Sequence, residues 1–299
     1  MRCGLIGYGY WGQKIARVLN QLGVLRAICD KNCFNLLDGY EKVSCLYGYE
    51  NLLAESDAVV IATPPETHYE IAKVALEAGK HVFVEKPLAT DYKQAKELEE
   101  LAKEKGLRLR VGHIYLHCPG LLAIPKFIGE AELWVKLLNI AGAPSETTRE
   151  IIWAGLPHAV SIALHFFGDK PDDIRIMKKD EHRVRLDLAW DDHSRAYLDV
   201  GDYTGRRMRD VELRVGNTRW NFNADKPYIQ RMTVSEGEIR LWCSPDLQKT
   251  IASVSESSDP DPLTLELKAF LEKDGVDTMG SKVVKLIEEI RDAIPETNK

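Results

Sequence analysis

The sequence lacks the features that would direct it to a membrane or to a nucleic acid. No run of apolar residues approaches the roughly 20 that a membrane-spanning helix needs, and the chain begins directly with a predicted strand. The net charge is −6, which argues against a general polyanion-binding surface. The most basic run, residues 206–209, is short and is followed by Asp210, so we interpret it as a solvated strand edge. We expect no membrane and no nucleic-acid partner.

Cysteine is present, but without the spacing of a structural framework. The six cysteines include no CxxC pair, the spacing of many zinc sites and redox dithiols. Cys3 and Cys29 fall inside predicted buried strands, where a thiol acts as a small apolar side chain. We therefore expect no metal site, no disulfide framework, and reduced cysteines in a cytoplasmic protein.

The residues that are present indicate a globular chain of two domains. Its 299 residues are 44% hydrophobic and 29% charged, which is typical of a protein with sizeable cores. Over residues 1–119, short apolar strands alternate with amphipathic helices, as in an α/β, doubly wound parallel sheet. Over residues 120–299, strands that alternate apolar and polar residues predict an α+β domain with an open, mainly antiparallel sheet.

A glycine motif joins the first predicted strand to the first predicted helix. Gly7, Gly9 and Gly12 form the pattern G-x-G-x-x-G, which lets the backbone and a helix N-terminus approach a pyrophosphate. Asp30 ends the next strand, where a carboxylate accepts hydrogen bonds from an adenosine ribose. A 2′-phosphate would meet like charge there, which favours NAD over NADP, although Lys31 could pair with such a phosphate. We interpret residues 1–119 as a dinucleotide-binding Rossmann domain, and the alternative is a glycine turn that binds nothing.

The segment HVFVEKPLA, residues 81–89, is a buried strand that ends abruptly in charged residues. In open α/β sheets the ligand crevice lies beyond the carboxyl ends of the strands. The glycine motif, Asp30, Thr63 and the pair Glu85-Lys86 all fall at that edge. We therefore expect Lys86 at the rim where the nicotinamide end of a cofactor lies.

Three segments together resemble the Gfo/Idh/MocA family of oxidoreductases, named after glucose–fructose oxidoreductase and inositol dehydrogenase. They are CGLIGYGYWG, DAVVIATPPETHYEIAKVALEAGKHVFVEKPLA and RVGHIYLHCPG. The middle segment is the most specific, because EKP follows TPPETH and an alanine-rich helix. The resemblance covers residues 1 to about 120 closely and the remainder loosely. The later segment WAGLPHAVSIALHFFG looks most like the branch that acts on sugars, often nucleotide-linked.

The resemblance implies a role for each matching residue. It implies that the pyrophosphate is held by Gly7, Gly9, Tyr10, Trp11 and Gly12, and the ribose by Asp30. It implies a cofactor wall made of Thr63, Pro64, Pro65 and His68. Glu85 would approach the nicotinamide ribose, and Lys86 would contact both nicotinamide and substrate. The Lys86–Pro87 bond is frequently cis in such enzymes, which would aim the lysine into the cleft. The cofactor is then NAD, with NADP possible, and the exposed sheet face would build a homodimer or homotetramer.

A histidine begins the apolar helix predicted over residues 156–168. Pro157 suits the first helical position, so His158 falls in the first turn, where the helix dipole favours a neutral ring that can accept a proton. Family position favours a catalytic role over a histidine with no chemical task. His113 and Tyr115 follow the last strand of the first domain and are candidates either for substrate binding or for simple packing.

The resulting hypothesis is hydride transfer between NAD and a secondary alcohol or ketone of a sugar. His158 would accept the hydroxyl proton, and Lys86 would hydrogen-bond the developing alkoxide. Ala154 and Ala159 stand where the branch commonly has acidic residues. Two alternatives therefore stay open: an NAD(P)-binding regulator without turnover, and a dehydrogenase or reductase of a non-sugar carbonyl.

Overall fold

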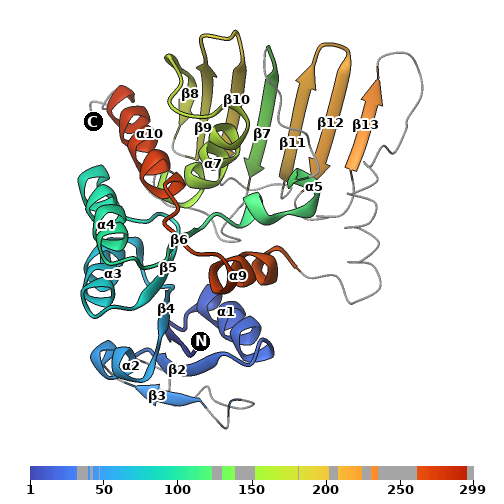
Figure 1. The fold of residues 1–299 in the computed structure, drawn as a ribbon. Coiled ribbons are helices and arrows are strands. Elements are labelled where there is room, and N and C mark those ends of the chain that lie inside the picture. The colour runs from blue at the N-terminus through green and yellow to red at the C-terminus, as the bar shows by residue number, and fades with distance from the viewer. Residues whose placement is uncertain are drawn as a thin grey trace. The chain divides into compact units, whose positions relative to one another are not determined.

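The computed structural model describes residues 1–31, 40, 43–46, 48–122, 130–138, 152–180, 182–201, 208–223, 230–234 and 261–294 (Figure 1). The chain divides into two compact units. The first comprises Met1–His113 and Leu263–Val284, and the second comprises Ile114–Pro262 and Lys285–Lys299. The predicted division at residue 119 differs from this arrangement, because the segment Leu263–Val284 near the C-terminus packs with the first unit.

A six-stranded parallel sheet forms the centre of the first unit, in the order β3-β2-β1-β4-β5-β6. The strands are β1 (Cys3–Ile6), β2 (Leu25–Cys29), β3 (Ser44–Leu46), β4 (Ala58–Ile61), β5 (His81–Glu85) and β6 (Leu109–Gly112). Every residue of β1 and β4 is buried, as expected for strands covered on both faces. The strand order reverses between β1 and β4, which confirms the predicted doubly wound sheet. In sheets of this kind, ligands bind beyond the carboxyl ends of the strands at such a reversal.

The helices of the first unit follow the predicted alternation. They are α1 (Tyr10–Gln21), α2 (Tyr49–Glu55), the 3-10 turn η2 (Pro65–Thr67), α3 (His68–Glu77), α4 (Tyr92–Glu104) and α9 (Pro262–Glu272). Helix α9 packs through Phe270 against Phe83 of β5, with ring centroids 5.7 Å apart. Next to it, Val276 forms a parallel bridge with Leu109 of β6. These contacts explain why the segment Leu263–Val284 belongs to the first unit.

A seven-stranded sheet forms the second unit, in the order β13-β12-β11-β7-β10-β9-β8. The strands are β7 (Glu132–Leu138), β8 (Asp173–Asp180), β9 (Arg183–Ala189), β10 (Arg195–Gly201), β11 (Met208–Val215), β12 (Thr218–Asn223) and β13 (Gln230–Val234). All neighbouring strands are antiparallel except β7 and β10. The predicted open, mainly antiparallel sheet is confirmed. A two-residue hairpin at Gly216, whose φ is 54°, joins β11 to β12.

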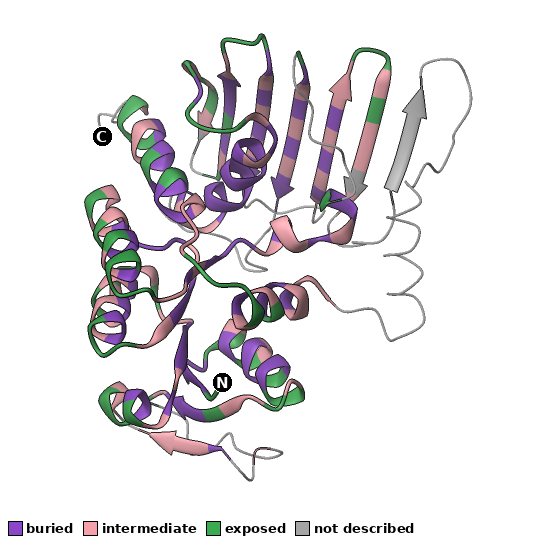
Figure 2. Ribbon diagram, viewed as in Figure 1, coloured by how far each residue is buried: buried purple, intermediate pink, exposed green. Residues whose placement is uncertain are grey.

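Helix α7 (Leu156–Phe167) covers one face of this sheet, where it contacts β7 and β10 (Figure 1). Buried and half-buried residues alternate along β7, β10 and β11, as Figure 2 shows by their banding. On the half-buried side, Trp134 stacks on Tyr197 with ring centroids 5.1 Å apart, and the guanidinium of Arg214 lies 4.1 Å from the Trp134 ring. The remaining helices are η3 (Ile114–His117), α5 (Pro119–Leu122) and α10 (Met279–Ala293).

Two expectations from the sequence are wrong in part. Arg209 is only 7% exposed, because it lies on the same side of β11 as the buried Val211 and Leu213 and so is not a solvated edge. Residues 206 and 207 lie outside the described residues. Cys3, Cys29 and Cys118 are buried thiols, but Cys45 is disulfide-bonded, so the expectation that the cysteines are all reduced is wrong for Cys45.

Within the described ranges, no helix is both long and apolar enough to cross a bilayer. The same ranges hold no cluster of three or more side chains suited to bind a metal ion.

Candidate active site

The turn between β1 and α1 has the geometry that a dinucleotide requires. A Cβ on Gly12 would lie 2.2 Å from the carbonyl oxygen of Gly7, and a Cβ on Gly7 would lie 2.5 Å from that of Ala62. Gly7 also has a φ of 96°, which favours glycine. A Cβ on Gly9 would meet nothing within 4 Å, so this position leaves open space beside the turn. Gly7 and Gly12 are therefore required by the protein's own packing, and Gly9 keeps a space where a pyrophosphate fits.

Helix α1 presents its N-terminus to that space. Its first turn contains no acidic residue, and Tyr10 at its start is 75% exposed. The ammonium of Lys14 lies 4.4 Å from the Tyr10 ring and 4.8 Å from the Trp11 ring. The helix dipole and this ammonium group both favour an anion at the N-terminus.

Asp30 directly follows β2 and lies next to the glycine turn. Its Oδ2 accepts a hydrogen bond from the backbone N–H of Tyr8 at 2.8 Å. This contact fixes the carboxylate at the carboxyl edge of the sheet, beside the turn where a ribose would lie in a Rossmann domain. The residues present thus fit a bound dinucleotide.

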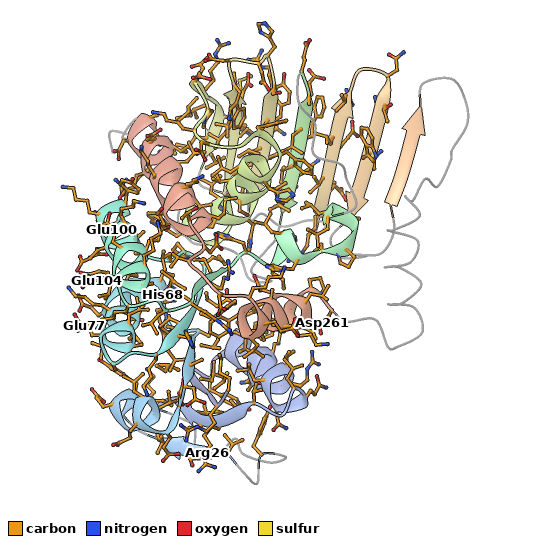
Figure 3. All side chains as sticks on the ribbon, in the orientation of Figure 1. Arg26, His68, Glu77, Glu100, Glu104 and Asp261 are labelled. Carbon is orange, nitrogen blue, oxygen red and sulfur yellow. The ribbon has the colours of Figure 1, made fainter. Side chains whose placement is uncertain are left out.

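The loop after β4 and the loop after β5 are joined by His68. His68 is labelled in Figure 3. Its Nε2 lies 2.8 Å from the carbonyl oxygen of Thr63, and its Nδ1 lies 2.7 Å from that of Pro87. The hydroxyl of Thr67 donates to that of Thr63 at 2.7 Å, above the turn that begins at Pro64 and Pro65. With both ring nitrogens facing backbone carbonyls, His68 positions these two loops and does not itself present a polar atom to a cofactor. Burial lowers the pKa of His68.

Glu85 and Lys86 end β5 at the same edge. The indole Nε1 of Trp11 donates to Oε1 of Glu85 at 2.5 Å, so the first helix is tied to the end of β5. Burial raises the pKa of Glu85 to about 7, against the opposing effects of Lys86 and Trp11. Burial lowers the pKa of Lys86, and the charge of Glu85 opposes that shift. The Lys86–Pro87 peptide bond is cis, as the resemblance implied.

His113 follows β6 and is 2% exposed. Neither of its ring nitrogens has a hydrogen-bond partner among the described residues. Burial, aided by the charge of Lys86, lowers its pKa to about 3, so the ring is neutral at physiological pH. A buried neutral imidazole with two unsatisfied nitrogens beside an ammonium group is suited to bind a polar substrate group.

Sequence reasoning missed Glu266 on α9. Its side chain is 2% exposed, and neither carboxyl oxygen has a hydrogen-bond partner in the described part of the chain. Burial raises its pKa well above the usual range, and the charges of Glu85 and Asp277 act in the same direction. The available signal was a single glutamate at an apolar position of an amphipathic helix, since Leu263, Leu267 and Phe270 are also buried.

In the second unit, His158 lies in the first turn of α7, as predicted. Its ring packs edge-on against the ring of Tyr115, with centroids 4.8 Å apart and planes at 88°. The hydroxyl of Tyr115 accepts a hydrogen bond from Nη1 of Arg209 at 2.7 Å. All three residues are 7% exposed. Arg209 is therefore part of this candidate site, a position that the sequence did not predict.

The structure brings the predicted residues together within each unit. The first unit gathers the cofactor candidates and Lys86 at one edge of the parallel sheet, and the second joins His158 to Tyr115 and Arg209. Lys86 belongs to the first unit and His158 to the second, so their meeting at one reactive carbon stays a prediction.

Comparisons with known proteins agree with this geometry. Residues 1–113 match the family model GFO_IDH_MocA, described as an oxidoreductase family with an NAD-binding Rossmann fold. The chain is 30% identical over 192 residues to UDP-N-acetylglucosamine 3-dehydrogenase of Acidithiobacillus ferrooxidans. That alignment covers 63% of this chain and 61% of the relative, so it spans less than two thirds of the relative's length.

Solved structures share the fold over nearly the whole chain. A structure of the same UDP-N-acetylglucosamine 3-dehydrogenase has a TM-score of 0.79 at 22% identity and covers 98% of this chain and 97% of that one. A levoglucosan dehydrogenase in complex with NADH and levoglucosan has a TM-score of 0.75 at 16% identity and covers 98% of this chain and 96% of that one. The match to the Gfo/Idh/MocA oxidoreductase family thus covers residues 1–113, the part of this chain that contains the glycine turn and the EKP segment.

Proposed function

We propose that this protein is an NAD-dependent oxidoreductase that transfers hydride between the nicotinamide and a secondary alcohol or ketone of a sugar or nucleotide-linked sugar. The observation that carries the proposal is the position of Lys86. It directly follows β5 at the carboxyl edge of the parallel sheet, next to Glu85, which binds the Trp11 indole, and near the neutral His113, whose pKa its charge helps to lower. Two relatives named as sugar dehydrogenases support the substrate class.

When bound, NAD would supply the hydride acceptor at this edge. Gly7, Gly9, Gly12, Tyr10 and Trp11 would hold its pyrophosphate. Thr63, Pro64 and Pro65 would shape the wall of the site, with His68 holding that wall from behind. Asp30 would bind the adenosine ribose and Glu85 the nicotinamide ribose.

The chemistry is assigned to two nitrogen groups. Lys86 would donate a hydrogen bond to the oxygen of the reacting carbon and so stabilise the negative charge that develops there. His158 would accept the hydroxyl proton as the general base. Tyr115 packs against the His158 ring and fixes its orientation, and His113 would hydrogen-bond a substrate hydroxyl.

The test begins with a screen of sugars and nucleotide-linked sugars for NAD reduction. With a substrate found, Lys86→Ala and His158→Ala should each lower kcat by at least about 100-fold, the usual range for a lost acid–base or oxyanion-stabilising group. Lys93→Ala and His165→Ala are the matched controls, because Lys93 is exposed on α4 and His165 is half-buried on the same helix as His158. Near wild-type turnover in both Lys86→Ala and His158→Ala would refute the assignment.

A second candidate is an NAD-binding regulator without turnover. Ala159, which stands where the sugar-acting branch commonly has an acid, is fully buried on α7 next to His158. Because position 159 is alanine, it offers no carboxylate that could orient His158 or accept a hydrogen bond from a substrate hydroxyl. Saturable NADH binding without oxidation of any sugar in the screen would favour this candidate.

The homodimer or homotetramer is also a proposal. The half-buried face of the second sheet carries the Trp134–Tyr197 stack and Arg214, an aromatic and arginine-rich surface of the kind enriched in protein interfaces. A cytoplasmic location stays a prediction from the cysteine pattern of the sequence.

A further inference from the structure

Helix α9 brings a second carboxyl group to the end of β5. Nη1 of Arg108 donates to the carbonyl oxygens of Phe270 and Leu271 at 3.3 and 2.5 Å. Because Arg108 lies just before β6, the C-terminal end of α9 lies at the amino edge of the parallel sheet. The N-terminal half of α9 therefore points towards the carboxyl edge, where β5 ends.

The packing of two aromatic rings then aligns the carboxyls. Phe270 packs on Phe83. Glu266 lies four residues before Phe270 on the same helical face, a rise of about 6 Å. Glu85 lies two residues after Phe83 on the same strand face, a rise of about 6.6 Å. The rise from Phe270 to Glu266 and the rise from Phe83 to Glu85 are nearly equal, and both run towards the carboxyl edge of the sheet. Glu266 therefore lies over Glu85.

Burial decides how this pair is charged. Neither oxygen of Glu266 accepts a hydrogen bond from a donor among the described residues, and an ionised carboxylate in that position would lose its hydration without compensation. Glu85 already accepts hydrogen bonds from the Trp11 indole and, at 3.3 Å, from the backbone N–H of Lys86. Two adjacent carboxylates would also repel each other, and the charge of Asp277 adds to that repulsion.

We propose that Glu266 is a positioning residue for Glu85, and that the two carboxyls share one proton. Glu266 carries the proton and donates it in a hydrogen bond to the Glu85 carboxylate. A single negative charge then lies beside Lys86, and Glu85 stays oriented towards Trp11. The shared proton stands on the packing of α9 alone, whereas its effect on cofactor binding rests on the proposed function.

The shared proton is tested by stability as a function of pH. An unfolded glutamate releases its proton near pH 4.3, whereas the folded protein keeps the Glu266 proton to higher pH. The free energy of unfolding of the wild type should therefore fall as pH rises above about 4.3. Glu266→Gln cannot ionise at this position, so it should not show this part of the decrease. The urea midpoint of Glu266→Gln should rise relative to the wild type between pH 5 and pH 8. Glu272→Gln, an exposed change on the same helix, is the control and should show a constant difference.

A constant difference for Glu266→Gln as well would overturn the shared proton. Infrared spectroscopy gives a second readout, since the wild type should show a protonated-carboxyl band at neutral pH that Glu266→Gln lacks. Absence of that band would have the same meaning.

The positioning role is tested by fluorescence titration with NADH at pH 7.5. The amide of Glu266→Gln still donates to Glu85, so its affinity should stay within about threefold of the wild type. Glu266→Leu fills the space but donates nothing, and its affinity should fall about tenfold or more. Wild-type affinity in Glu266→Leu would overturn the positioning role. Absence of NADH binding by the wild type would instead refute the proposed function, and the stability series would still decide the shared proton.

Discussion

The backbone N–H of Tyr8 holds Oδ2 of Asp30 at 2.8 Å, which fixes a carboxylate beside the glycine turn. If this carboxylate binds the adenosine ribose, Asp30→Ala should weaken NADH binding by about 10- to 100-fold, the loss of one or two charge-assisted hydrogen bonds. NADPH binding should weaken far less, because its 2′-phosphate no longer meets like charge. Fluorescence titration with both cofactors measures this change in preference.

Lys31→Ala is the matched change at the next residue. It should change the affinity for NADH by no more than about twofold and should lower the affinity for NADPH. An exposed lysine contributes little binding free energy unless it pairs with a charged group such as the 2′-phosphate. Tighter binding of NADPH than NADH by the wild type would contradict the assignment of Asp30.

The neutral His113 should make stability depend on pH. Its pKa is about 3 in the folded chain and near 6.5 when unfolded, so the unfolded state takes up the proton first as pH falls. The stabilising effect is complete above pH 6.5 and is lost between pH 6.5 and about pH 3. His113→Gln cannot titrate there, so its urea midpoint should decline less steeply than that of the wild type over this window. Equal slopes would show that His113 is not buried in its neutral form.

A double-mutant cycle measures how much the Arg209–Tyr115 hydrogen bond contributes to the free energy of unfolding. Tyr115→Phe keeps the ring that packs on His158 but removes the acceptor of a buried guanidinium, so it should cost about 1–3 kcal/mol of unfolding free energy. In an Arg209→Met background the same change should cost much less, because that donor is gone. Additive costs in the cycle would mean that the two side chains do not interact.

Asp91 should stabilise helix α4 as its N-cap. Its carboxylate accepts a hydrogen bond from the backbone N–H of Gln94 at 3.0 Å. Asp91→Ala should cost about 1 kcal/mol, and Asp91→Asn, which also caps, should cost close to nothing. Thermal or urea unfolding measures both, and a loss with Thr90→Ala equal to that with Asp91→Ala would assign the cap to Thr90 instead.

The aromatic face of the second sheet should govern subunit assembly. Trp134→Glu or Tyr197→Glu would place a charge in the proposed interface and should convert an oligomer into monomers in sedimentation velocity. Met177→Glu is the control, because Met177 is already 64% exposed on the edge strand β8. An unchanged sedimentation coefficient in all three variants would place the interface elsewhere or show that the protein is monomeric.

Local patterns predicted most of the fold. The continuous apolar run Ala58–Ile61 is a strand buried on both faces. The run Arg183–Ala189 alternates apolar and polar residues, and this two-residue period is typical of a strand buried on one face. Val184, Leu186 and Leu188 are buried on one face, as expected. The edge of the parallel sheet that carries Asp30, Glu85 and Lys86 follows from strand direction alone, so the candidate cofactor residues could be named from the sequence.

Contacts across long sequence distances could not be predicted in the same way. Arg209 looked solvated because arginine is rarely buried, and its hydrogen bond to Tyr115 joins residues 94 positions apart. The burial of Glu266 depends on the packing of α9 against β5, which joins residues far apart in the sequence. The division of the chain into two contiguous domains at residue 119 did not anticipate the return of α9 to the first unit.

That return also bears on how the protein is made. Synthesis from His113 to Leu263 takes roughly 8 to 30 s at about 5–20 residues per second. Throughout this interval the nascent Rossmann domain lacks the helix that covers Phe83, and the face of β5 stays open to water. A nascent chain that stalls before α9 emerges therefore keeps an apolar patch on its surface, a feature that chaperones bind and that promotes aggregation.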